Sequence, residues 1–384
     1  MVAIVEKTHP AERYAHEVCD GIIPAAKPTR DACARYFRDV KEAKDLGIFF
    51  HRDSAQWVIE FTRKLKHSKG ERWAGTYFDP EPWQQFINWN LFGWHMRETG
   101  LRRFITSYVE VPRKNGKSFD AASKAVTFLF AGDKGAPEIY TAATKQKQAK
   151  ITHGEAVNMI MAEPSLKKLV RYVASQNLLT VPKTGAELYP LSSEKNRDGY
   201  NPAMCVIDEY HAHPTSEVYD DLMGGMGARE EPLAYIITTA GVSGSPCEQM
   251  SEQTKKVLAG EAQQLRHFGF ITTVDDPKDW RDESEWIKAN PNWGVSLKPS
   301  FMRATYEEAI ANPSKLLYFK NKHLNIWTGN STKGVDIEQW KATGTGAQYG
   351  AGDRCYLGVD LSSRVDLTAV ALVFPKDDGT FHLV

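Results

Sequence analysis

Residues 109–120, VEVPRKNGKSFD, end in Gly116, Lys117 and Ser118, as a phosphate-binding loop does. Such a loop needs inward-pointing backbone N–H groups, a lysine for the β- and γ-phosphates, and a hydroxyl for Mg²⁺. It also lies between a strand and the N-terminus of a helix. The position of the usual first glycine holds Val111. The loop alone therefore allows two interpretations, an ATP site or an ordinary surface turn.

A second stretch, AMCVIDEYH at residues 203–211, is an apolar run that ends in Asp208 and Glu209. A carboxylate at a strand end holds Mg²⁺, and a neighbouring one orients the attacking water. The alternative is a buried strand whose acids lie at its solvated edge. Because both stretches occur in the right order, they favour a site for ATP and Mg²⁺.

A glutamine precedes the loop in PWQQF, residues 82–86. The amide of Gln84 could form paired hydrogen bonds with the edge of an adenine ring. The alternative is a residue at the start of a helix, beside a packed Trp83.

Strands and helices alternate around these stretches. The sequence predicts strands at 102–111, 136–144, 201–210 and 232–241, and helices at 116–132 and 145–163. This alternation is typical of an α/β fold, here the parallel sheet of a P-loop NTPase flanked by helices. We expect a helical region at 1–70, the ATPase domain at 71–265, and a small linker subdomain at 266–350. Residues 351–384 begin another domain with two strands joined by a short turn.

The bulk composition excludes several classes of protein. Lys+Arg and Asp+Glu both number 48, so a globally basic nucleic-acid binder is not indicated, although a local basic groove is possible. The five cysteines are widely spaced, which fits a reduced, intracellular chain. No signal peptide or membrane span is recognisable, so we expect a cytosolic protein without a membrane partner.

Over residues 75–384 the chain resembles the large terminase subunit of phages, the motor that packages viral DNA. The resemblance rests on an ordered set of stretches: PWQQF, VPRKNGKS, IYTAATKQKQA, NPAMCVIDEYH, YIITTAG, NPNWG, LNIW and GVDLSSRVDLTAV. It implies a motor that couples ATP hydrolysis to translocation of double-stranded DNA into a procapsid. The family tolerates a degenerate phosphate loop, so the resemblance resolves the ambiguity at Val111 in favour of ATP.

We therefore expect nucleotide binding by Gln84 and by six consecutive residues, Arg113, Lys114, Asn115, Gly116, Lys117 and Ser118. Lys117 and Ser118 would bind phosphates and Mg²⁺. Arg113, or else Lys114, would add a cation near the γ-phosphate.

Asp208 would hold the metal and Glu209 would activate water. Thr238 and Thr239, in IITTAG, resemble a coupling motif that links hydrolysis to movement. The alternative for this pair is β-branched residues that fill a strand.

An arginine finger is also implied, because an arginine supplied by a neighbouring subunit stabilises transition-state charge. Arg197 is the candidate and Arg229 its rival. The alternative for Arg197 is a solvated loop residue.

Residues 358–370, GVDLSSRVDLTAV, resemble the first hairpin of an RNase H-like nuclease. Asp360 matches an aspartate that binds catalytic Mg²⁺ or Mn²⁺, and Asp366 could be structural or an outer ligand. Two-metal nucleases need several carboxylates. Because the family's later acids would lie beyond Val384, we expect a shortened chain without nuclease activity.

The implied partners are double-stranded DNA, a small terminase subunit and a portal protein. We expect a ring of identical chains when assembled, with a monomer possible in solution, in the bacterial host's cytoplasm and transiently docked on the procapsid. Basic stretches at 63–72 and 145–150 are candidates for contacts with DNA phosphates. Two alternatives remain: a helicase-like ATPase, from the D-E-x-H spacing of residues 208–211, and an inactive prophage remnant that only binds partners.

Overall fold

The structure is a computed structural model. It describes residues 8–131, 135–144, 146–192, 199–329, 342–344, 349–350, 352–360 and 369–383. The chain forms two compact units, residues 1–330 and 331–384.

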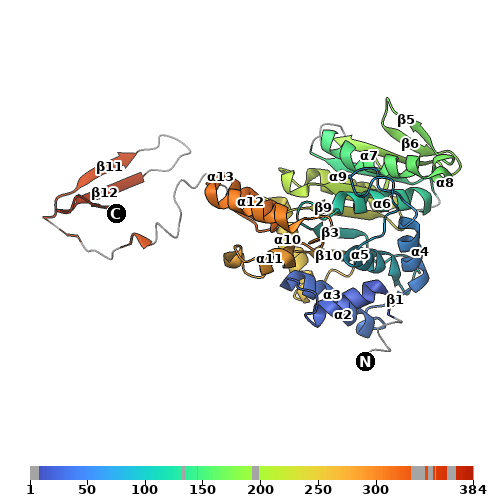
Figure 1. The fold of residues 1–384 in the computed structure, drawn as a ribbon, viewed down its shortest axis with the longest axis horizontal. Coiled ribbons are helices and arrows are strands. Elements are labelled where there is room, and N and C mark those ends of the chain that lie inside the picture. The colour runs from blue at the N-terminus through green and yellow to red at the C-terminus, as the bar shows by residue number, and fades with distance from the viewer. Residues whose placement is uncertain are drawn as a thin grey trace. The chain divides into compact units, whose positions relative to one another are not determined.

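An eight-stranded sheet organises the first unit, in the order β10-β3-β9-β8-β4-β7-β6-β5 (Figure 1). Its strands are β3 (Thr106–Glu110), β4 (Glu138–Ala143), β5 (Arg171–Val173), β6 (Leu178–Val181), β7 (Ala186–Ser192), β8 (Pro202–Asp208), β9 (Leu233–Thr238) and β10 (His267–Ile271). The strands from β10 to β7 are parallel, and β6 and β5 continue the sheet antiparallel. The predicted α/β fold with a parallel sheet is therefore confirmed. All four predicted strands are present, whereas β5, β6, β7 and β10 were not predicted.

Side chains alternate between the two faces of the sheet, as the period of a strand requires. In β8, Met204 and Val206 join one apolar core, while Cys205 and Ile207 join the other. The first core is covered by α5 (Pro82–Gly93), α6 (Lys117–Ala131), α7 (Gln146–Ala162) and the N-terminal helices. The second is covered by α9 (Glu217–Gly225) and the start of α10 (Pro246–Ala259). Because both faces are buried, β8 reads as a continuous apolar run.

The N-terminal region is part of the same body as the sheet. Its elements are α2 (Pro10–Cys19), α3 (Lys27–Glu42), β1 (Ile48–Phe50) and α4 (Arg52–Thr62); β1 pairs with β2 (Trp94–Met96). The buried guanidinium of Arg103 donates to both carboxylate oxygens of Asp39, at 2.8 and 3.2 Å. This ion pair ties α3 to the residues that lead into β3. Over the described residues 8–70 this region is mostly helical, contains the strand β1, and packs into the same core as the sheet.

A smaller helical group follows the sheet. It comprises η3 (Pro277–Asp279), α11 (Glu283–Ala289), α12 (Pro299–Ala311) and α13 (Pro313–His323), around a separate core that includes Trp280, Trp286 and Phe319. Figure 1 shows α11, α12 and α13 gathered at one end of the unit. The boundary predicted at residue 265 needs correction, because β10 is an edge strand of the large sheet. Gly269 permits this packing, since a Cβ there would lie 2.3 Å from Cγ2 of Thr254 in α10.

Short elements complete the first unit: α8 (Pro164–Lys167), η1 (Tyr210–Ala212) and η2 (Met226–Ala228). Over the described residues, no helix has the length and apolar character needed to span a membrane.

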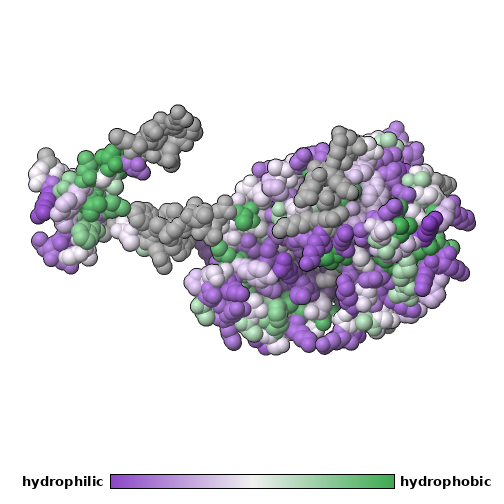
Figure 2. Space-filling view, turned by 90° about the horizontal axis from the view of Figure 1, so that it is seen from above, coloured by the Kyte–Doolittle hydropathy of each residue, from purple (hydrophilic) through white to green (hydrophobic). Residues whose placement is uncertain are grey.

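The second unit contains an antiparallel sheet of β11 (Tyr356–Asp360), β12 (Ala369–Pro375) and β13 (Phe381–Leu383). The two predicted strands are present, and the connection that contains Asp366 lies outside the described residues. Leu357 is 62% exposed and Phe381 67% exposed. Figure 2 shows the corresponding green, hydrophobic surface on this unit.

Candidate nucleotide-binding site

Three parallel strands end at the same edge of the sheet. Glu110 of β3 is in register with Thr238 of β9, and Asp208 of β8 is in register with Ile237. Because β9 lies between β3 and β8, the loop after β3, the end of β9 and the acids at the end of β8 are neighbours. Ligands of parallel α/β sheets bind at this carboxyl edge. The fold therefore brings together the two sequence stretches that carry the chemistry.

The loop between β3 and α6 is held in a fixed conformation. Lys114 and Gly116 both have left-handed backbone angles, with φ of 71° and 82°. Glycine adopts such an angle without strain, and a Cβ at Gly116 would also lie 3.4 Å from Nε2 of Gln84. Asn115 is fully buried, and its Nδ2 donates to the carbonyl oxygens of Pro112 and Arg113 at 3.1 and 3.2 Å. The loop thus has the strand–loop–helix setting that phosphate binding requires.

Two asparagines in the NPNWG stretch hold the loop from outside. Nδ2 of Asn115 donates to Oδ1 of Asn290 at 2.8 Å, and the backbone N–H of Asn292 donates to Oδ1 of Asn115 at 3.0 Å. Nδ2 of Asn292 donates to the backbone oxygen of Asn115 at 3.2 Å. In the sequence this stretch is a point of resemblance without an assigned role, because its partner, Asn115, lies more than 170 residues before it.

Lys117 and Ser118 occupy the first turn of α6, and Asp208 ends β8. Burial lowers the pKa of Lys117, and the charges of Glu209 and Asp208 oppose that shift. Burial, and then the charge of Glu209, raises the pKa of Asp208, while a 2.8 Å hydrogen bond from Thr152 and the charge of Lys117 lower it. A buried cation and a buried carboxylate beside a half-buried hydroxyl suit a phosphate group and a divalent cation. These residues therefore fit Mg²⁺-ATP.

Glu209 directly follows the strand in a left-handed conformation, with φ 53° and ψ 45°. Such strain in a non-glycine residue is a feature of functional sites. Its backbone N–H donates to Oδ1 of Asp208 at 2.8 Å, and its Oε2 lies 3.3 Å from Nδ1 of His211. Its carboxylate is more accessible than that of Asp208, which suits contact with water.

Thr238 and Thr239 are fully buried at the end of β9, and both hydroxyls have polar partners. Oγ1 of Thr238 accepts from the backbone N–H of His211 at 3.0 Å. Oγ1 of Thr239 accepts from Nζ of Lys322 at 3.1 Å. The pair thus lies between the turn that carries Glu209 and the end of α13. Their predicted coupling role stays a prediction.

The predicted cations have different surroundings. Nη1 of Arg113 donates to the hydroxyl of Tyr318 in α13 at 2.6 Å, and Lys114 is exposed. Arg197 lies outside the described residues. The guanidinium of Arg229 donates to the backbone oxygens of Asn201 at 2.9 Å and Gly135 at 3.0 Å, so it stabilises its own chain. Arg197 as a finger stays a prediction.

Gln84 is buried in the first turn of α5. Its Oε1 accepts from the backbone N–H of Glu81 at 2.9 Å, which closes a capping box. The contact expected of a helix-start residue is therefore present, and Nε2 lies on the side of Gly116. Adenine recognition by Gln84 stays a prediction.

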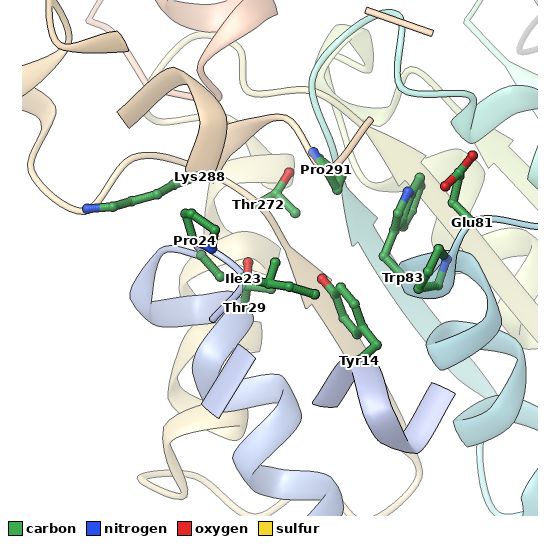
Figure 3. Close-up of a pocket in the computed structure, with 11 residues that line it drawn as sticks. Tyr14, Ile23, Pro24, Thr29, Glu81, Trp83, Thr272, Lys288 and Pro291 are labelled. Atoms are coloured by element: carbon green, nitrogen blue, oxygen red, sulfur yellow. The ribbon is translucent and has the colours of Figure 1, made fainter. Parts of the chain in front are cut away.

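A separate cavity of about 220 Å³ lies beside the start of α5 (Figure 3). Tyr14, Thr29, Trp83 and Thr272 are among the residues that line it, and none of the predicted nucleotide-binding residues does. Nε1 of Trp83 donates to Oδ1 of Asn292 at 2.6 Å, so one wall of the cavity is connected to the phosphate loop.

Asp360 is the last residue of β11 and is exposed in the second unit. Its predicted role as a metal ligand stays a prediction.

Comparison with known proteins identifies the family. A model of the terminase large subunit ATPase domain matches residues 82–256, and one of the terminase large subunit endonuclease domain matches 261–384. Protein YmfN of Escherichia coli K12 is 35% identical over 196 residues, which cover 50% of this chain and 43% of YmfN. The large terminase subunit of Enterobacteria phage HK97 is 26% identical over 282 residues, 72% of this chain and 54% of that protein.

The fold agrees with this finding. The crystal structure of the HK97 bacteriophage large terminase aligns with a TM-score of 0.61 and 22% identity, over 86% of this chain and 67% of that one. The chain spans about half the length of the curated relatives it matches. Since both family models describe the same protein and together extend from residue 82 almost without a break to residue 384, this chain belongs to the family of terminase large subunits.

Proposed function

We propose that this chain is an ATP-driven motor that packages double-stranded DNA into a procapsid. One observation carries the proposal: Lys117, Asp208, Glu209 and Thr238 lie at one edge of a parallel sheet, beside a loop with a left-handed glycine. This arrangement is the one that ATP hydrolysis needs, because the phosphates, the metal and the attacking water must be held together.

Each residue of the site has a proposed task. The loop N–H groups and Lys117 bind the phosphates, with Arg113 and Lys114 as further cations and Gln84 at the base. Ser118 and Asp208 hold Mg²⁺, which neutralises charge on the transferred phosphoryl group when it is bound. Glu209 orients the attacking water and accepts its proton. Thr238 and Thr239 pass the state of the site to α13, and Arg197 reaches the site of a neighbouring chain.

DNA contacts are proposed to involve phosphates, because a packaging motor accepts any sequence. Within the 63–72 stretch, Arg63 and Lys66 form ion pairs with Asp79 and Glu163. Charges paired in this way are less available to DNA, so the exposed lysines of α7, Lys147 and Lys150, are the better candidates.

The proposed assembly follows the family. A small terminase subunit and a portal protein are the proposed partners, in a ring that docks on a procapsid in the host cytoplasm, with the free chain a monomer. Asp360 is proposed to bind Mg²⁺ or Mn²⁺ in a nuclease domain.

The test is steady-state ATP hydrolysis by the purified chain, with and without linear duplex DNA, beside Glu209→Gln. This variant keeps the size of the side chain and removes the base, so we expect turnover to fall by about 10²-fold or more. Stimulation by blunt linear DNA without unwinding of a forked duplex supports a packaging motor, whereas unwinding favours the helicase alternative. Binding of Mg²⁺-ATP without turnover under any condition would favour the binding-only alternative.

A further inference from the structure

Lys322 approaches the candidate site from α13, more than 200 residues after the phosphate loop. Its Nζ donates to Oγ1 of Thr239 at 3.1 Å and to the backbone oxygen of Ala240 at 3.0 Å. Its own backbone oxygen accepts from the N–H of Arg113 at 2.9 Å. Lys322 therefore touches both the phosphate loop and the end of β9.

The charges around Lys322 favour an anion. Burial lowers its pKa to about 8; the charge of Glu209 opposes this shift, and the charges of Arg113 and Lys117 add to it. Cys247 of α10 also acts on it, and the charge of Lys322 in turn lowers the pKa of His211. Three cations, Arg113, Lys117 and Lys322, thus repel one another, and the carboxylate of Glu209 is the opposing charge. A phosphate group would relieve the repulsion among them.

The neighbours of Lys322 in the chain form hydrogen bonds with the loop after β9 and with the end of β3. Nδ2 of Asn321 donates to the oxygen of Gly241 at 2.9 Å, and Oδ1 of Asn325 accepts from the N–H of Ala240 at 3.0 Å. Nε1 of Trp327 donates to Oε1 of Glu110, the last residue of β3, at 3.2 Å. A change at Lys322 would therefore reach this segment, residues 321–328, through direct contacts.

We propose that Lys322 binds the terminal phosphate of ATP and thereby makes segment 321–328 respond to ATP and not to ADP. The inference rests on the proposed ATPase function and adds a residue to it. An ammonium group has three donors. The bonds to Thr239 and Ala240 use two of them, so the third can be donated to a phosphate oxygen without the loss of either bond.

The test is calorimetric titration of the chain with a non-hydrolysable ATP analogue and with ADP, each with Mg²⁺. For Lys322→Gln we expect the affinity for the ATP analogue to fall about 10-fold or more, as the loss of a charged hydrogen bond implies, and the affinity for ADP to change less than about 2-fold. Lys322→Arg should restore much of the preference for the ATP analogue. Lys315→Gln is the matched control, because Lys315 is exposed on the same helix and pairs with Glu308 at 3.5 Å.

The outcomes separate the two proposals. A Lys322→Gln variant that keeps the parent's ratio of affinities, or that loses both affinities equally, overturns the role of Lys322 and leaves the ATPase proposal standing. A parent chain that binds neither nucleotide overturns both. If Lys322→Gln does not fold, Lys322→Met keeps the aliphatic stem and is titrated in its place.

Discussion

The hydrogen bond from Thr152 to Asp208 gives a direct test of the metal site. Thr152 lies in α7 and is fully buried, and its Oγ1 donates to Oδ2 of Asp208 at 2.8 Å. Thr152→Val keeps the shape of the side chain and removes the donor. The change alters the carboxylate through a partner that would touch neither nucleotide nor metal.

The magnitude follows from the kind of bond. A hydrogen bond to a charged group contributes about 1.5–3 kcal/mol, which corresponds to about 10- to 150-fold in an equilibrium constant. The same bond also lowers the pKa of Asp208, against the larger effect of burial. Its loss raises that pKa further, so Asp208 stays protonated up to a higher pH. We therefore expect the acidic limb of ATPase activity to move to higher pH, and half-maximal activity to need about 10- to 100-fold more Mg²⁺.

The assay is ATP hydrolysis titrated with Mg²⁺ at several pH values. Thr127→Val is the matched control, because Thr127 is also a buried helical threonine, but its hydroxyl donates to the backbone oxygen of Ser123 at 2.9 Å. It should change neither the Mg²⁺ requirement nor the pH profile. An unchanged Mg²⁺ requirement and acidic limb in Thr152→Val would refute the reasoning, as would equal shifts in both variants.

Two further predictions concern stability. Asn115→Ala leaves Oδ1 of Asn290 and the N–H of Asn292 without their partner, so the free energy of unfolding in urea should fall by about 2–6 kcal/mol. As a control, Asn158→Ala at an exposed position should change the free energy of unfolding by less than about 1 kcal/mol. Equal effects of the two variants would contradict the role of Asn115 in holding the phosphate loop. Burial lowers the pKa of His267 from 6.5 to about 4, so between these pH values the unfolded chain binds a proton that the folded chain does not. The free energy of unfolding should therefore fall as pH falls from 6.5 towards 4, by up to about 3 kcal/mol. Urea unfolding across that range should show a weaker pH dependence of the free energy of unfolding for His267→Gln than for the parent. An identical pH dependence in both would exclude His267 as its source.

The sequence predicted those parts of the fold that have strong local signals. The apolar run before Asp208 and the β-branched run before the phosphate loop became β8 and β3. Strands β5 and β6 are short, β5 is largely exposed, and β10, HFGFI, contains a glycine that weakens the pattern of a strand. The last of these was missed for a physical reason, since Gly269 is required by close packing against α10 and not by local preference.

The parts of the site that the sequence did not predict come from distant segments. Asn290, Asn292 and Lys322 occur in stretches without a chemical motif, and only the packing of the helical group against the loop gives them a role. Thr152 likewise belongs to no motif, and its role follows only from the position of α7, which brings it into contact with Asp208. Motifs predict groups that touch a ligand, whereas the groups that hold them in place depend on tertiary contacts.

The same contacts explain how the loop can dispense with its usual first glycine. Val111 is fully buried in the core of the sheet, and its N–H donates to the oxygen of Thr238 at 3.1 Å, so position 111 still continues β3. A valine is favourable there, because an extended backbone needs no left-handed angle. The loop turns later, at Lys114 and Gly116, and the strained Lys114 is held by a 2.6 Å hydrogen bond from Ser296 to its oxygen. Contacts from the helical group thus supply the rigidity of this loop, so changes in that group should alter phosphate binding even where they touch no nucleotide.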